Sequence, residues 1–473
     1  MTDQVEPSTR PGVYGERVAA VEPGGVERIP ETERHGSPVQ LFWTWASPNL
    51  EFATVFIGVL AVGAFGLGFW QTVLALSIGT ALGSVTHGVL SARGPGHGVP
   101  QMVLGRAAFG FWGNILPAGL MSVTAGIGWF AVNSVSGAFA LSALTHLPAL
   151  GSLVLIVLLQ IIVAFFGHNL VHVFERYAFV FLAVVFVVAS AVILIRSHPG
   201  AAIPSAGVPG AFLLTVASAF GYAAGWNPYA SDYARYLPKA TNRLATGLWS
   251  GLGVFVSCVV LEVVGAASVT AGVAGSDNPT EAFTGQLPTV VAGLTLVAIA
   301  LGAVAANVLN IYSGAMSFLA MGITLSAKFR RALVAVVFGT AGFFVAWLGL
   351  DDAGQKYENF LLVIAYWIAP WLGVFFTDQY LRRRTRIDDL LYDRRYRNGA
   401  GPVAMAVGIV VSVALFGNQT DYVGIVPRLV PDIGDVTFLV GFAVAGAVYA
   451  TLRRPPRADV AAAELGANTP RHT

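Results

Sequence analysis

Two pairs of side chains in this sequence have the types and spacing to recognise a small planar molecule. Trp129 and Asn133 are four residues apart, and Asn307 and Asn310 are three apart, so each pair would share one face of a helix. An indole can stack on a flat heteroaromatic ring, while carboxamides pair with its edge. A single Asn could instead only join two helices; the whole set favours a binding site for an uncharged ligand.

Two acidic residues, Glu51 and Glu262, fall within apolar segments. A carboxylate is costly inside a membrane, so each is a candidate group for binding and releasing a proton. Each could also be a structural acid paired with a buried polar group. Asp232 and Arg235 follow an apolar segment closely, and we interpret them as a gate or a loop ion pair.

Other site chemistries find no support in the sequence. The one cysteine, Cys258, allows no intrachain disulfide and no cysteine-rich metal site. The glycines between residues 94 and 105 lack the lysine and strand of a phosphate-binding loop. No nucleophile–base arrangement and no nucleic-acid-binding fold is evident. We therefore expect no enzyme activity, no metal and no cofactor.

The composition is that of a membrane protein. Only 11% of the 473 residues are charged and 55% are apolar, with a mean hydropathy of +0.69, whereas soluble domains carry about 25% charge. A water-soluble enzyme of this length is thereby excluded. Segments this apolar must satisfy their backbone internally, which predicts an all-α integral membrane protein with 12 transmembrane helices. The predicted spans are 42–65, 70–92, 113–144, 150–167, 174–195, 210–230, 246–273, 289–323, 332–349, 359–380, 402–417 and 436–452.

The basic residues predict the orientation. With the N-terminus inside, all of the 27 Lys and Arg residues except Arg196, Lys356 and Arg428 fall on the inner side, as the positive-inside rule requires. Both termini are expected in the cytoplasm, with the protein in the plasma membrane. Residues 1–38 are polar and lack the apolar core of a signal peptide, so we expect a disordered arm. Residues 453–473 are expected to form a similar tail.

Two of the predicted helices contain interruptions. The first span contains Ser47-Pro48-Asn49, and the sixth contains Gly225-Trp226-Asn227-Pro228. Either could be an ordinary proline kink. Helices 1 and 6, however, are the first members of two five-helix halves, and matching interruptions of that kind indicate a transporter binding site near the membrane midplane.

The segment from Gly225 to Pro238 resembles the signature of the cytosine/purine permeases, a branch of the nucleobase–cation symporter family. The resemblance extends over about residues 25–455. Its further matches are Glu27-Arg28-Ile29-Pro30, Ser47-Pro48-Asn49-Leu50, Gln101-Met102-Val103-Leu104-Gly105-Arg106, Trp129 with Asn133, Asn310-Ile311-Tyr312-Ser313, and Asp378 with the basic residues after it.

The resemblance implies a LeuT-like fold. A membrane domain over residues 39–452 would comprise two inverted five-helix repeats, at about 42–195 and 210–380, and two extra helices within 402–452. The resemblance also implies import of a nucleobase together with a cation. In the site that it implies, the base stacks between Trp129 and Trp226, Asn133 and Asn310 bond its edge, Gly225 offers backbone and Ser47 contacts it.

The sequence departs from the family where sodium-coupled relatives place hydroxyl groups. The matching positions before Asn310 are Val304 and Ala305, which offer no side-chain oxygen to a hard cation. This favours protons as the coupling ion, without excluding sodium.

The resulting hypothesis is a symporter that imports cytosine or a purine such as adenine, guanine or hypoxanthine by alternating access. Its expected partners are the base and the lipid bilayer, with no nucleic acid and no obligate protein partner. One alternative is a related transporter for hydantoin or allantoin, pyridoxine or thiamine-like compounds. A channel or membrane sensor is a further alternative, which the paired interruptions disfavour.

Overall fold

The computed structural model describes residues 25–453, except residues 167, 202–206, 273–277, 324–326 and 384 and the side chains of 164–179 and 324–335. The described part is all-helical, with two isolated β-bridges. Its main helices are α1 (Gln40–Ala46), α2 (Phe52–Gly63), α3 (Phe69–Ser91), α7 (Ile115–Val123), α8 (Phe130–Thr145), α9 (Ala149–Phe166), α10 (His168–Arg196), α11 (Ala211–Gly225), α13 (Arg243–Thr270), α15 (Thr289–Ala320), α16 (Ala327–Gly349), α17 (Ala353–Leu381), α18 (Ala400–Phe416) and α20 (Thr437–Leu452).

Many of these helices are long and apolar enough to cross a membrane. Within the described residues, five meet that standard outright, a sixth does so if a bent pair is counted as one span, and five shorter apolar helices accompany them. Apolar side chains also lie on the outside, such as Leu244 and Ile195, which are 79% and 84% exposed. The protein is therefore a multi-pass membrane protein. The 15-residue α11 falls outside both groups, so the count of twelve spans stays a prediction.

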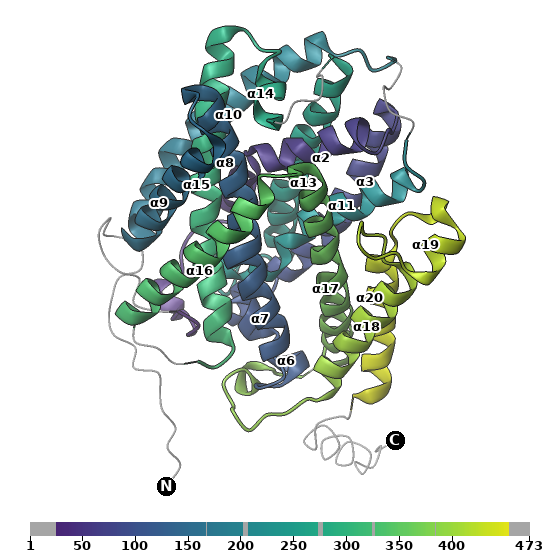
Figure 1. The fold of residues 1–473 in the computed structure, drawn as a ribbon. Coiled ribbons are helices and arrows are strands. Elements are labelled where there is room, and N and C mark those ends of the chain that lie inside the picture. The colour runs from purple at the N-terminus through teal and green to yellow at the C-terminus, as the bar shows by residue number, and fades with distance from the viewer. Residues whose placement is uncertain are drawn as a thin grey trace, which may run out of the picture.

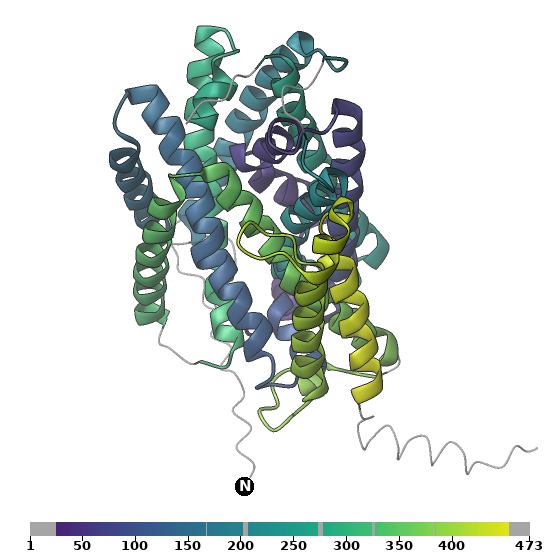
Figure 2. The ribbon, with the colours of Figure 1, turned by 45° about the vertical axis from the view of Figure 1, so that its right-hand side comes forward.

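The helices form two packed groups. One consists of α2, α3, α11 and α13, and the other of α8, α9, α10, α15 and α16. Helix α17 packs on α11 and also on α18 and α20. The pair α18 and α20 lies beside α17, on the side of the molecule away from α9 and α16 (Figure 1, Figure 2).

Glycines bring α2 and α13 into backbone contact. A Cβ on Gly58 would overlap the carbonyl oxygen of Glu262, and one on Gly265 would overlap that of Val55. Lipid tails are as apolar as the helices, so close approach of this kind is a main source of helix association in a membrane. The two glycines therefore fix the distance between these helices.

The chain is ordered well before the first span. Ile29 is 1% exposed, and its backbone N–H donates to the carbonyl of Gly98 at 2.9 Å. The Arg34 side chain donates to the carbonyl of Pro95 at 2.8 Å. The disordered arm predicted for residues 1–38 is therefore wrong for residues 25–38, because contacts with the loop after α3 hold them. Residues 1–24 and 454–473 lie outside the described residues.

Asp388 ties this arm to the loop after α17. Its carboxylate lies 2.5 Å from Arg28 Nη2 and 3.1 Å from His97 Nδ1. Burial acts to raise the pKa of Asp388, but the hydrogen bond and charge of His97 and the charges of Arg28 and Lys239 outweigh it, so the pKa is lowered. The ionised carboxylate thus joins three segments that are distant in sequence.

The glycine contact between α2 and α13 leads to a stability prediction. Gly58→Ala should lower the free energy of unfolding by about 1–3 kcal/mol, because the added methyl group meets backbone that cannot move aside. Gly63→Ala, on the same helix, is the control, since its Cβ would lie 3.8 Å from Val269 in ordinary contact. Thermal unfolding in detergent measures both, and equal midpoints would contradict the close contact.

Candidate functional site

The first interruption separates α1 from α2. A short 3-10 turn, Ser47–Asn49, follows α1, and Glu51 is extended with φ −144° and ψ 166°. The two helical pieces meet at a bend of 60°. Pro48 has no N–H to donate, so the helix cannot continue regularly through it.

The second interruption follows α11. After Gly225 the chain enters a 3-10 turn, Asn227–Tyr229, and then the short helix α12 (Ala230–Ala234). The N–H of Trp226 bonds the carbonyl of Ala223, and the N–H of Tyr229 bonds that of Trp226. These bonds span three residues instead of four, the pattern of a tightened helix end.

One side chain connects the two interruptions directly. The carboxamide of Asn49 donates to the carbonyl of Trp45 at 2.7 Å and to Ser257 Oγ at 3.1 Å. Its oxygen accepts the indole N–H of Trp226 at 2.9 Å. Asn49 is fully buried, whereas Ser47, the helix 1 residue that the family resemblance implied, is half-buried. Asn49 was not among the predicted site residues, and its amide beside Pro48 is the sequence feature that could have indicated this contact.

Both indoles lie inside the protein, close to Gly225. Trp129 ends a π-helical turn, Thr124–Trp129, and a Cβ on Gly225 would lie 3.2 Å from its Cζ2 atom. Tyr222 packs edge-on against Trp129 at 5.4 Å, and Tyr229 packs against Trp226 at 5.3 Å. Trp129 thus contacts the backbone of the second interruption, from which Trp226 itself projects.

The amides form a hydrogen-bonded row across α8, α15 and the second interruption. The oxygen of Asn307 accepts from Asn133 at 3.0 Å and from Asn310 at 3.4 Å. Tyr229 donates to the oxygen of Asn310 at 2.9 Å. Among the described residues, the side-chain oxygen of Asn133 has no hydrogen-bond partner. The helical spacing indicated the Asn307–Asn310 pair, while the central place of Asn307 depends on packing between helices.

The two embedded carboxylates have different neighbours. Glu51 accepts from Tyr222 Oη at 3.0 Å, and the same hydroxyl lies 2.5 Å from Thr54 Oγ1. Glu262 accepts from Thr80 Oγ1 at 2.8 Å. Neither carboxylate has an ion-pair partner in the described part of the chain. Through Tyr222, Glu51 lies one side chain away from Trp129, whereas Glu262 packs between α13 and α3.

Asp232 and Arg235 lie at the far end of the second interruption, under the N-terminal arm. Asp232 accepts the backbone N–H of Gln101 at 2.9 Å. Arg235 donates to the carbonyl of Gly25 at 3.0 Å and lies 3.4 Å from the hydroxyl of Tyr312. These contacts hold the N-terminal arm and the segment before α7 against α12. A gating role for Asp232 and Arg235 stays a prediction.

An all-helical membrane domain with an aromatic and amide site at two interrupted helices has the architecture of a membrane transporter. Residues 28–441 match the model of a family described as permease for cytosine/purines, uracil, thiamine, allantoin. The chain belongs to this family, whose members are permeases and not enzymes.

Individual relatives match over nearly the whole chain. The putative purine-cytosine permease YxlA of Bacillus subtilis is 28% identical, covering 92% of this chain and 96% of its own length. The purine-cytosine permease FCY2 of Saccharomyces cerevisiae is 30% identical, with 91% and 85% covered. The structure resembles Mhp1, a nucleobase-cation-symport-1 family transporter, in a closed conformation with bromovinylhydantoin bound, at a TM-score of 0.70 and 20% identity over 91% and 94% of the chains. The fold is therefore LeuT-like.

The contacts of Asn49 predict which substitution disturbs the site most. Asn49→Ala removes the side chain that bonds the indole N–H of Trp226 and the carbonyl of Trp45. The free energy of unfolding should therefore fall by about 1–3 kcal/mol. Of the Asn49 contacts, Ser257→Ala removes only the one at 3.1 Å and keeps the bond to Trp226; the other bonds of the Ser257 hydroxyl go to carbonyls within its own helix, at Gly253 and Val254. Thermal unfolding of both variants in detergent tests this, and a larger loss for Ser257→Ala would refute the assignment.

Proposed function

We propose that this protein is a secondary active transporter that imports a nucleobase, cytosine or a purine such as adenine, guanine or hypoxanthine, together with protons. The observation that supports it most is the pair of buried indoles at the second interruption: Trp129 lies against Gly225, and Trp226 is the next residue along the chain. A row of amides connects to the same interruption through Tyr229. A flat ring with donors and acceptors on its edge is the ligand that such a set suits.

In this proposal each site residue has one role. The base stacks between the indoles of Trp129 and Trp226, and Asn133 and Asn310 bond its edge. The side-chain oxygen of Asn133, for which the described residues offer no hydrogen-bond partner, is an acceptor for an N–H of the ligand. Gly225 lets the ring approach the backbone, and Ser47 contacts it from the first interruption.

The proposed architecture of the whole membrane domain is based on the LeuT-like fold. Twelve spans would form two inverted five-helix repeats and two C-terminal helices, which exchange outward- and inward-facing states. The distribution of Lys and Arg supports cytoplasmic termini in the plasma membrane. No metal, cofactor or obligate protein partner is needed for this mechanism.

Proton coupling is proposed from the surroundings of Glu51. A Cβ on Gly302 of α15 would lie 3.8 Å from the Cβ of Glu51, so Glu51 lies where the first interruption meets α15. Val304 and Ala305 bring no side-chain oxygen to that region, which disfavours sodium. A buried carboxylate without a cationic partner is costly, and a proton removes that cost.

Uptake into proteoliposomes tests the proposed function. Under an imposed pH gradient, acidic outside, the vesicles should accumulate labelled cytosine or a purine above the outside concentration. Trp226→Ala should weaken base binding by about 1–3 kcal/mol, the range for loss of an aromatic stacking partner. Trp70→Ala is the matched control, because Trp70 is 69% exposed on the outer face of α3 and should leave uptake unchanged.

The same assay separates the alternatives. Accumulation of none of these bases would end the nucleobase proposal. Stronger competition by hydantoin, allantoin, pyridoxine or thiamine would assign a different cargo within the family. Dissipation of a solute gradient without net accumulation would indicate a channel, because a pore cannot concentrate its solute.

Replacement of the two carboxyl groups tests the proton carrier. Glu51→Gln should still bind base and exchange labelled for unlabelled base across the membrane. Its pH-driven accumulation of base should fall at least tenfold, because an amide cannot bind and release a proton as a carboxyl group does. Glu262→Gln is the comparison, since it is also buried but bonded to Thr80, away from the indoles. If only Glu262→Gln lost coupling, Glu51 would not be the carrier.

A further inference from the structure

A groove of about 550 Å³ runs between α3 and α13, and glycines form its floor. The two helices are antiparallel here, because Gly88 meets Gly247 while Ser84 meets Gly251. A Cβ on any of these three glycines would lie 2.5–2.9 Å from a backbone carbonyl oxygen of the other helix. The backbones are therefore in contact, and no large side chain fills the space above them.

The rim of the groove is apolar and faces outward. Four large apolar side chains on it are exposed: Val85 and Val89 of α3, and Leu244 and Leu248 of α13. Both helices are long and apolar enough to cross a membrane. Exposed apolar walls on membrane-spanning helices match the hydrocarbon of lipid, so the groove opens towards the bilayer.

The length of the groove corresponds to one leaflet. Along α13 it extends from Arg243 to Phe255, a stretch that rises about 18 Å along the helix axis. One half of a bilayer hydrocarbon core is about 15 Å thick. An acyl chain whose headgroup lies at the Arg243 end therefore fits along the groove.

Two arginines lie close together at that end. Arg243 lines the groove, and its charge acts on Arg93, just after α3. A Cβ on Gly96 would lie 3.5 Å from Arg243 Nη2, which places this guanidinium group beside the turn that follows Arg93. Within the described residues neither arginine has an ion-pair partner. Asp378, whose charge also acts on Arg93, is paired with Arg382 at 2.7 Å.

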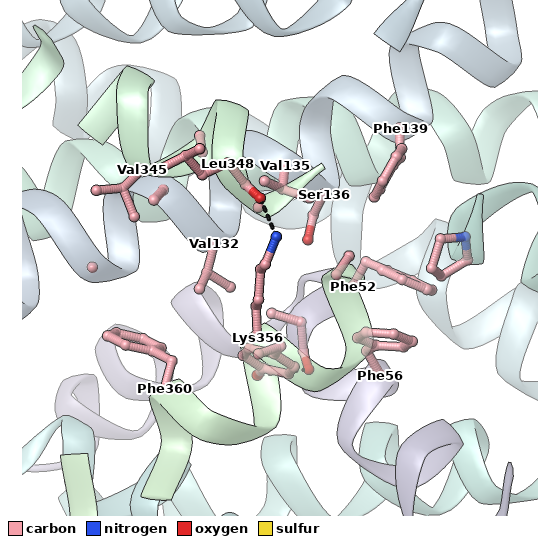
Figure 3. Close-up of a pocket in the computed structure, with 18 residues that line it drawn as sticks. Phe52, Phe56, Val132, Val135, Ser136, Phe139, Val345, Leu348, Lys356 and Phe360 are labelled. Atoms are coloured by element: carbon pink, nitrogen blue, oxygen red, sulfur yellow. Dashed lines mark hydrogen bonds between the residues drawn. The ribbon is translucent and has the colours of Figure 1, made fainter. Parts of the chain in front are cut away.

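Lys356 shows a different arrangement of a positive charge. It projects into a cavity of about 240 Å³ between α2, α8, α16 and α17, where its ammonium group donates to the carbonyl of Leu348 (Figure 3). That charge is bonded within the protein. Arg93 and Arg243 form no such ion pair or hydrogen bond with the described part of the chain, so an anion from outside can bind them.

We propose that this groove binds an anionic glycerophospholipid, with its phosphate on Arg93 and Arg243 and one acyl chain along the glycine floor. Guanidinium groups bond phosphate oxygens through two parallel N–H groups. The distribution of Lys and Arg puts this end at the cytoplasmic leaflet, where basic residues attract anionic lipids. A zwitterionic lipid also fits the apolar groove, but it brings a cationic group to the arginines, so the pair selects a net negative headgroup.

Lipid retention by the purified full-length chain in detergent tests the headgroup. Phosphatidylglycerol and phosphatidylcholine with identical acyl chains are compared by native mass spectrometry. The protein should retain phosphatidylglycerol at least fivefold better, and Arg243→Gln should lower this preference at least threefold. Arg395→Gln, exposed in the loop between α17 and α18, removes the same charge and should leave the preference unchanged. Equal preferences in the two variants would overturn the site.

A second variant tests the groove itself. Val85→Trp puts a larger side chain on the rim and should lower retention of both lipids, while the thermal midpoint in lipid-free detergent stays near that of the unmodified chain. Unchanged retention would overturn the groove as the acyl-chain site. Inorganic phosphate alone should not raise the thermal midpoint as phosphatidylglycerol does, and an equal rise would assign the arginines to a free anion. These measurements need no base, so their failure leaves the transport proposal intact.

Discussion

An interrupted helix inside a membrane has to satisfy its freed backbone groups within the protein, and here one buried amide does so. Asn49 accepts the indole N–H of Trp226 and donates to the carbonyl of Trp45, which lies in the last turn of α1, where helix carbonyl groups need partners from outside the helix. The same bonds that make the first interruption tolerable therefore also fix an aromatic ring at the second. The orientation of the candidate site follows from this backbone constraint.

Much of the fold could be predicted from the sequence, because hydropathy and proline mark helix positions directly. The predicted spans 402–417 and 436–452 differ by at most two residues from α18 and α20. The site was predicted less completely. Spacing puts Asn307 and Asn310 on one face, but it cannot say that Asn307 rather than Asn310 receives Asn133. That choice depends on how α8 and α15 are rotated against each other.

The N-terminal arm shows where composition misleads. Its residues are polar and rich in Pro, Glu and Arg, which is typical of disorder. Yet Ile29 is buried, and Arg34 and Arg28 find partners in loops about 60 and 360 residues further on in the chain. Local composition cannot predict such contacts, because the segments that stabilise the arm come together only when the helices fold.

Tyr222 gives the proposed coupling a physical route. Its ring lies edge-on against Trp129 while its hydroxyl donates to Glu51. Two ligands can influence each other only through a group whose arrangement both of them change. In the proposed mechanism, a base stacked on Trp129 would act on this ring, and a proton on Glu51 would change what its hydroxyl can bond. The proposed binding and protonation would therefore meet at Tyr222, in the last turn of α11 before the second interruption.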